Sequence, residues 1–506
     1  MGGRAAAGVW IGLAALGATI GIDAAVGAGG PCWTTVHADP NIGAASFLGF
    51  SVVLGRDVLA AGAPDDPLGG PLTGAIVRYE RTSVFWHPAQ TLRLATPQNN
   101  DRLGERLGAD AGTIVAGLPN RSQFRGAAAV FSQTDAGPFI EQTLLTAPDA
   151  VLFDLFGWSV GVGDGFIAVG APGRDDKGQA SGAVYLFTQS LAAELPGAPA
   201  PWHFAGKLVP NQLVTGDGFG TSISARGDLL AIGASGGVGS VYVYSIEVQT
   251  PSAPGSPAQA TPTLLERIVA PAGAQHAGFG AAIAIDRALD DSVRLVAAAS
   301  GASLDPGVVF VYERESSAAT WTLAATLPGS APNTRYGRSV AIAGDVLLIA
   351  EPRAAVPSSF GPGLNAGRVL RYQRAGGVWS PAEVWTNPNP FTPGGAGDEF
   401  GQSVAALGDE ASVGAWLDDR AGNDAGAVFH YVGLIGLDCN QNGNPDACDI
   451  AFGCSRDTTG DRVPDDCEGR IFTPDITGPG LDGVPDGVVN TFDLIYFLNL
   501  WMDSSG

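Results

Sequence analysis

The chain has 506 residues, of which 45% are hydrophobic and 15% are charged, so it can bury a large core and is not disordered. Its 73 glycines and 35 prolines predict short strands joined by many turns, and so an all-β fold. The formal net charge of −23 repels phosphate backbones, which argues against a nucleic-acid partner and favours bound cations.

Residues 1–28 have the pattern of a secretory signal peptide. Arg4 precedes an apolar run of small residues and leucine, and Val26-Gly27-Ala28 has the small-residue character of a cleavage site. The alternative is an uncleaved anchor helix over residues 5–22. We expect cleavage and secretion, and no later segment is long and apolar enough to predict a membrane span in the mature chain.

A three-part motif recurs along most of the chain. An aromatic residue or leucine followed by glycine opens each of seven units, at Gly49, Gly104, Gly157, Gly220, Gly280, Gly337 and Gly401. A tripeptide such as Gly170-Ala171-Pro172 follows, and then a glycine that opens an apolar strand, as in GAVYLF at Gly182. Because a run ending in proline precedes each next unit, every unit of 53 to 64 residues predicts four short strands.

Four strands per repeat predict one propeller blade, because a lone blade cannot cover both of its faces whereas a ring of blades can. We therefore predict a seven-bladed β-propeller over residues 29–436. The segment 33–40 resembles the proline-ended fourth strand but precedes the first unit. We expect it to supply the outer strand of blade seven.

The repeat markers resemble the FG-GAP repeat family, the propeller of integrin α subunits, over about residues 33–432. This resemblance implies ligand binding on the face that gathers the loops after the Gly-Ala-Pro markers and the loops between units. Aromatic and arginine side chains suit anchoring roles at such a face. The candidate ligand-binding residues are Arg121, Phe124, Arg174, Asp175, Trp416, Asp418, Asp419 and Arg420.

Residues 437–470 contain two segments with the spacing of a twelve-residue calcium loop. Oxygen ligands at positions 1, 3, 5, 7, 9 and 12 converge on one hard cation. The first loop would use Asp438, Asn440, Asn442, Asn444, Asp446 and Asp449, and the second would use Asp457, Thr459, Asp461, the carbonyl of Val463, Asp465 and Glu468. The pair resembles thrombospondin type 3 repeats and the tails of secreted planctomycete proteins, so we expect calcium as the cofactor.

Residues 471–506 resemble half of a dockerin module. The matching ligand positions are Asp475, Asp486, the carbonyl of Val488, Asn490 and Asp493, with Asp482 as an alternative to Asp475 for the first position. The run 492–501 predicts a short C-terminal helix with one apolar side. The resemblance implies a cell-surface or matrix partner for the tail. For the helix itself we favour packing on its own loop over a partner-binding face.

Four of the five cysteines, Cys439, Cys448, Cys454 and Cys467, cluster in this tail. A small extracellular core needs covalent support, so disulfides are preferred to zinc, and three pairings are possible. No zinc-like Cys-x-x-Cys spacing accompanies them.

The sequence contains no nucleophile elbow, metalloprotease helix or phosphate-binding glycine loop. We therefore expect a secreted, non-catalytic recognition or adhesion protein that binds an extracellular protein or glycan. The alternatives are a polysaccharide-acting enzyme with a propeller active site and a structural component of the cell surface or matrix.

Overall fold

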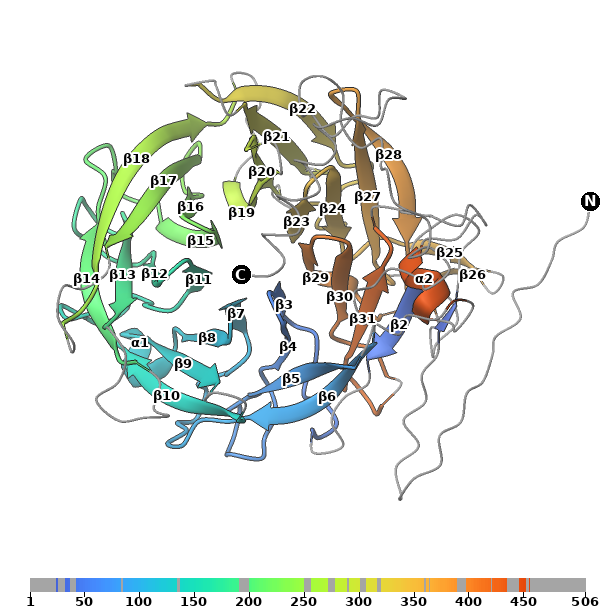
Figure 1. The fold of residues 1–506 in the computed structure, drawn as a ribbon, viewed down its shortest axis with the longest axis horizontal. Coiled ribbons are helices and arrows are strands. Elements are labelled where there is room, and N and C mark those ends of the chain that lie inside the picture. Colours follow the sequence, from blue (N-terminus) through green and yellow to red (C-terminus); the bar gives the residue numbers. More distant parts are fainter. Residues whose placement is uncertain are drawn as a thin grey trace, which may run out of the picture.

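The computed structural model describes residues 24–25, 32–36, 42–82, 85–133, 137–190, 200–249, 256–271, 278–288, 291–300, 306–315, 320–358, 361–363, 365–388, 397–419, 421–434, 446–451 and 455. Seven antiparallel sheets of four principal strands stand radially around one axis (Figure 1). The predicted all-β, seven-bladed propeller is confirmed.

The first four blades each consist of four consecutive strands. Blade 1 contains β3 (Val52–Gly55), β4 (Val58–Ala63), β5 (Ala75–Thr82) and β6 (Phe85–Leu92). Blade 2 contains β7 (Arg106–Asp110), β8 (Thr113–Leu118), β9 (Ala127–Gln133) and β10 (Phe139–Leu145). Blade 3 contains β11 (Ser159–Gly163), β12 (Phe166–Ala171), β13 (Ala183–Gln189) and β14 (Trp202–Leu208). Blade 4 contains β15 (Phe219–Arg226), β16 (Leu229–Ala234), β17 (Ser240–Gln249) and β18 (Gln259–Val269).

Blade 5 keeps the same order, and blade 6 carries an inserted hairpin between its second and third strands. Blade 5 contains β19 (Phe279–Arg287), β20 (Val293–Ala299), β21 (Val308–Arg314) and β22 (Thr322–Pro328). Blade 6 contains β23 (Val340–Ala343), β24 (Val346–Glu351), β27 (Arg368–Ala375) and β28 (Val378–Trp385), and the hairpin consists of β25 (Val356–Ser358) and β26 (Gly361–Gly363).

Blade 7 joins the two ends of the ring. Its inner strands are β29 (Phe400–Leu407), β30 (Glu410–Ala415) and β31 (Ala427–Val432). Its outer strand is β2 (Cys32–Val36), which pairs antiparallel with β31 from Cys32 opposite Val432 to Val36 opposite Val428. The sequence analysis predicted this position for the segment 33–40, as the outer strand of blade 7. A two-residue strand, β1 (Ala24–Ala25), extends the sheet and falls within the segment expected to be cleaved.

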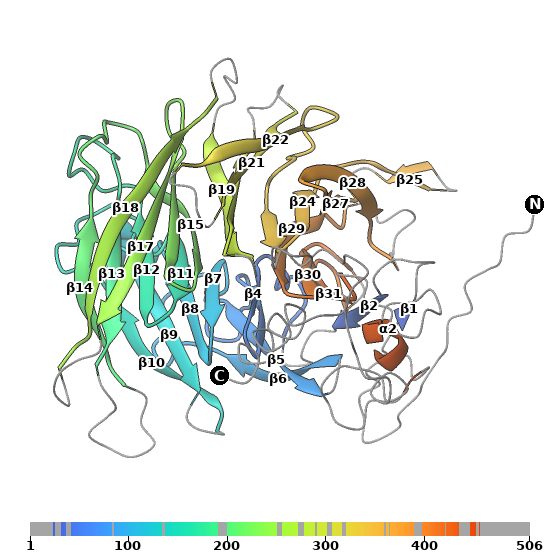
Figure 2. The ribbon, with the colours of Figure 1, turned by 45° about the horizontal axis from the view of Figure 1, so that its top comes forward.

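Two short helices are described. One is α1 (Arg121–Phe124), in the loop between β8 and β9, and the other is α2 (Asp446–Ala451). In Figures 1 and 2, α2 lies beside β2 at the outer edge of blade 7. No described helix has the length and hydrophobicity that crossing a membrane requires.

The repeated glycines are needed where one blade meets the next. The seven glycines of the first marker all have positive φ, which glycine adopts at no steric cost. The glycines of the second marker pack directly against them and leave no space for a side chain. A Cβ on Gly117, in the second marker of blade 2, would lie 1.8 Å from the carbonyl oxygen of Gly157 in blade 3. The sequence repeat is therefore a repeat of blade junctions.

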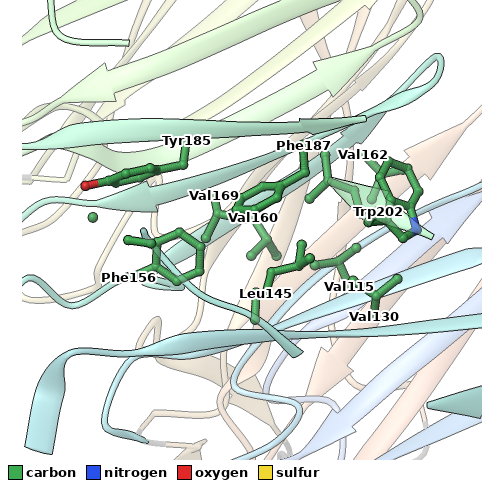
Figure 3. Packing of buried hydrophobic residues seen from close by; sticks show 14 of the residues in the cluster. Val115, Val130, Leu145, Phe156, Val160, Val162, Val169, Tyr185, Phe187 and Trp202 are labelled. Carbon is green, nitrogen blue, oxygen red and sulfur yellow. The ribbon is translucent and has the colours of Figure 1, made fainter. Parts of the chain in front are cut away.

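The hydrophobic core is divided into seven clusters, and each one lies between two neighbouring blades. Figure 3 shows the cluster between blades 2 and 3, where Val115, Val130 and Leu145 face Phe156 and Tyr185. Phe156 belongs to the first marker of its unit and is fully buried. Burial of large aromatic rings at the junctions stabilises the contact between neighbouring blades. The innermost strand of each blade faces the axis of the ring.

Candidate functional site: the channel mouth

The innermost strands of the seven blades surround two adjoining cavities along the axis, of about 240 Å³ and 230 Å³. The second cavity is lined by the three residues that follow each repeat glycine. We call it the channel mouth. The residues directly after the glycines are Phe50, Glu105, Trp158, Thr221, Ala281, Arg338 and Gln402. The mouth opens on the face that carries the loops between blades, because each inner strand begins there.

Serine occupies the next position in five of the seven blades and links neighbouring blades. The hydroxyl groups donate hydrogen bonds to the repeat-glycine carbonyl of the next blade in four cases: Ser51 to Gly104 (2.5 Å), Ser159 to Gly220 (2.6 Å), Ser222 to Gly280 (2.6 Å) and Ser403 to Gly49 (2.8 Å). The Ser339 hydroxyl instead accepts a hydrogen bond from the Val404 N–H at 3.1 Å. These bonds form a polar belt around the mouth.

Arg106 in blade 2 replaces the serine of this belt. Its guanidinium group lies over the Trp158 ring of blade 3, with 4.9 Å between the guanidinium carbon and the ring centroid. Its Nη2 is 3.4 Å from Glu105 Oε1, and its Nε is buried without a hydrogen-bond partner. Burial and then the nearby charge of Arg102 lower the pKa of Arg106, against the opposing effect of Glu105. A half-buried cation therefore takes the place of a neutral hydroxyl.

Arg338, from blade 6, lines the same cavity. It forms no ion pair with any carboxylate of the described residues. Burial, as the largest cause, and the positive charges of Arg106 and Arg335 together lower the pKa of Arg338 to about 10, against the opposing effects of Glu105 and Glu399. The mouth therefore brings together two guanidinium groups from blades that do not adjoin.

Glu105, which lines the mouth, and Glu399, which contacts it through Trp416, are already paired. Glu105 Oε2 is 2.7 Å from Arg102 Nε. Glu399 Oε1 is 2.9 Å from Arg353 Nε, its Oε2 accepts a hydrogen bond from Trp416 Nε1 at 3.1 Å, and Arg335 lies 3.7 Å away. Positive charge thus exceeds negative charge locally in a chain of net charge −23.

Aromatic rings and one amide complete the mouth. Trp158 and Phe50 are both half-buried, and the Phe50 ring packs edge-on against Trp416 with 5.2 Å between centroids. The side-chain oxygen of Gln402 is buried and has no hydrogen-bond partner. A buried acceptor of this kind loses free energy unless a ligand or water supplies a donor.

The structure places two of the predicted ligand-binding residues, Arg121 and Asp418, inside the chain. Arg121 is buried, with its Nη1 2.7 Å from the fully buried Asp101 and its Nη2 donating to the Thr96 carbonyl at 2.9 Å. Asp418 is also fully buried and accepts a hydrogen bond from Asn387 at 2.8 Å. Both side chains hold loops together, because each finds its partner inside the chain rather than in solvent.

Other predicted loop residues lie on the same face but are dispersed. Arg174 pairs with Asp149, Asp154 and Asp176, each at 3.1 Å. The Asp175 and Asp419 carboxylates accept hydrogen bonds from the backbone N–H groups of Ala180 (2.7 Å) and Asp424 (2.8 Å), so they close turns.

Phe124 is exposed, as Asp175 is, and the Phe124 ring stacks on Phe153 with 5.6 Å between centroids. Trp416 is the member that the structure brings to the channel mouth, through Phe50 and Glu399. Arg420 lies outside the described residues.

Most of the predicted calcium ligands also lie outside the described residues: Asp438, Asn440, Asn442, Asn444, Asp457, Thr459, Asp461, Val463, Asp465, Glu468, Asp475, Asp486, Val488, Asn490 and Asp493, together with Cys439, Cys454 and Cys467. Asp446 and Asp449 lie on α2. Cys448 is disulfide-bonded. Within the described ranges, no three His, Cys, Asp or Glu side chains are grouped so that they could hold a metal ion.

The sequence analysis missed Arg106, Trp158, Arg338 and Gln402. The signal was present, because aligning the seven units on their repeat glycines places all four in adjacent columns. In the second of these columns, Arg106 interrupts a run of serines, and a departure from a local rule is typical of functional positions.

Comparison with known proteins agrees with the fold. A family model described as FG-GAP repeat matches residues 139–187, 202–244 and 392–431. No curated protein matches the chain. Among solved structures, the chain is similar to the Niastella koreensis GH74 enzyme, with 14% sequence identity and a TM-score of 0.41. The match covers 74% of this chain and 51% of the enzyme, so this chain spans about half of that enzyme's length. The seven radial sheets define the protein as a seven-bladed β-propeller. Three of its segments match the FG-GAP repeat model.

Proposed function

We propose that the protein is a secreted, non-catalytic recognition or adhesion module that binds an extracellular ligand on the loop face of its propeller. The observation that carries this proposal is the channel mouth, where guanidinium groups, aromatic rings and an unpartnered amide oxygen converge on one cavity. Binding sites combine this kind of concave surface with a few convergent polar groups.

The groups at the mouth suit binding better than catalysis. A general acid or base must be able to exchange its proton with a substrate. Glu105 and Glu399, however, are both paired with guanidinium groups of the chain. The enzyme alternative therefore has no specific observation in its favour.

The tail supports the extracellular setting of the proposal. The calcium loops at 437–470 would have affinities of about 10⁻⁴ to 10⁻³ M, which suit only surroundings rich in calcium. In the first loop, positions 9 and 12 lie on α2, and a helix following the loop agrees with this kind of site. The remaining ligands would come from the preceding loop, and the tail would serve as a calcium-stiffened spacer or anchor.

Retention of the full chain on an array of extracellular glycans and proteins tests the proposal. We expect retention on at least one class of ligand, and we expect the channel-mouth substitution Trp158→Ala to weaken it. The control is Leu68→Ala, which removes an exposed apolar side chain from the same face outside the mouth. Failure of the wild-type chain to bind any ligand on the array, with calcium present, would overturn the proposal.

A further inference from the structure

The two guanidinium groups of the channel mouth differ from the other arginines of the ring. Bidentate carboxylate pairs occupy several of the others, such as Arg374 with both oxygens of Glu313 at 2.8 and 2.9 Å. Arg338 has no such partner among the described residues, and Arg106 has one contact, at 3.4 Å. Two half-buried guanidinium groups of like charge that line one cavity bind an anion favourably, because the anion offsets their charge and fills their donor sites.

We propose that the channel mouth binds a sugar-acid unit of an acidic polysaccharide, with its carboxylate held by Arg106 and Arg338. This proposal rests on the recognition function proposed above and specifies its ligand. The cavity of about 230 Å³ is large enough for such a unit, since a single water occupies about 30 Å³.

The other groups of the mouth favour a sugar acid over an acidic side chain of a protein. The buried Gln402 oxygen needs a hydrogen-bond donor, and a carboxylate alone has none. A sugar acid supplies a carboxylate for the guanidinium groups and hydroxyl donors for Gln402 in one unit. The flat rings of Trp158 and Phe50 are half-buried beside them and offer apolar surface to a sugar ring.

The rest of the molecule makes this recognition selective. A net charge of −23 repels polyanions from the surface as a whole, so general electrostatic attraction does not produce binding. Affinity for an acidic oligosaccharide would therefore report the local charge of the mouth.

Titration calorimetry with a short oligogalacturonate tests the proposal, with the methyl-esterified oligomer as the neutral ligand. Arg106→Ser is the principal variant, because serine is the residue of five other blades at this position and would restore the hydrogen-bonded belt without disturbing the fold. Arg338→Ala is the second variant. Arg125→Ala is the control, since Arg125 is exposed on the same face, outside the mouth.

We expect the wild-type chain to bind the acidic oligomer and not the ester. Each mouth variant should weaken binding about tenfold or more, and Arg125→Ala should leave it unchanged. Dextran sulfate tests whether sulfate can replace the carboxylate, and polyglutamate tests the acidic protein. Equal affinity for ester and acid, stronger binding of polyglutamate, or unchanged affinity in both variants would overturn the proposal. Retention of the wild type on a neutral glycan or a protein alone would overturn this inference while leaving the recognition function standing.

Discussion

Arg81 and Glu410 join blade 1 to blade 7 across the seam where the ring closes, with Nη1 to Oε1 at 2.5 Å and Nη2 to Oε2 at 2.7 Å. The Trp86 indole N–H also donates to Glu410 Oε2, at 3.3 Å. The Glu410 side chain is 6% exposed and that of Arg81 is 21% exposed. This bidentate ion pair therefore connects the first blade of the ring to the last.

Replacing Arg81 with alanine should lower the free energy of unfolding by about 3 kcal/mol, because the buried Glu410 carboxylate loses its guanidinium partner and keeps only weaker partners such as Trp86 and His430. Arg56→Ala is the control. Arg56 also pairs with carboxylates, Asp110 at 2.8 Å and Asp164 at 3.1 Å, but its side chain is 57% exposed, so we expect a loss of about 0 to 1 kcal/mol. Denaturant unfolding measures both, and equal losses would contradict this account of the seam.

Acid should weaken the same seam. Burial opposes ionisation of Glu410, but the hydrogen bond and charge of His430 together with Arg81 outweigh it and lower the pKa of Glu410. A lowered pKa in the folded state stabilises the fold above the unfolded-state value of about 4.3, and this stabilisation is lost as the pH falls below it. The free energy of unfolding of Glu410→Gln should therefore fall less steeply than that of the wild type below about pH 4.3. Parallel slopes would refute this role for Glu410.

The blade junctions should not tolerate a single added methyl group. Gly117→Ala would place a Cβ 1.8 Å from the Gly157 carbonyl oxygen, so we expect a loss of about 3 kcal/mol or more in the free energy of unfolding. The control is Gly206→Ala in β14, where a Cβ would meet nothing within 4 Å. Thermal unfolding of both variants checks the difference. A Gly117→Ala variant as stable as the control would mean that neighbouring blades can move apart.

Arg121→Ala should damage stability and leave ligand binding intact in the molecules that remain folded. The substitution exposes no new surface at the channel mouth but leaves Asp101 buried without its ion-pair partner, at a cost of about 3 to 5 kcal/mol. Measuring the unfolding free energy and the ligand affinity of the same preparation separates the two effects. A loss of ligand affinity with no loss of stability would instead show that Arg121 contacts the ligand.

Removing calcium should affect the tail and not the ring. In calorimetry, a chelator should shift a transition assigned to residues 437–506, and Asp438→Ala should reproduce that shift with calcium present. The main unfolding transition should stay in place, because the described part of the propeller has no cluster of three acidic or metal-binding side chains. A comparable shift of the main transition would place a calcium site inside the ring.

The fold could be predicted because the repeat marks the blade junctions, where physical constraints are strictest. Only glycine combines positive φ with backbone contact at positions such as Gly157 and Gly426, so these residues recur visibly. A buried aromatic residue such as Phe156 recurs for a similar reason, since it fills the space between two blades.

The site could not be predicted in the same way, because its residues do not recur. Arg106 and Arg338 stand at neighbouring positions of two different units, and the 231 residues between them give no sign that the ring brings both to one cavity. Loop residues such as Arg121 attracted attention because their side-chain types suit binding. Sequence alone does not tell whether an arginine faces solvent or a buried carboxylate such as Asp101.

The pairing of β2 with β31 also sets an order in time. Val432 is made 400 residues after Cys32, which takes about 20 to 80 s at 5 to 20 residues per second. During synthesis the strand made first has no partner, and its open edge can pair with other chains. Blades 1 to 6 can assemble as they emerge, but the circle is completed only when the last repeat arrives. Successful production of this protein therefore depends on keeping residues 32–36 unengaged until then.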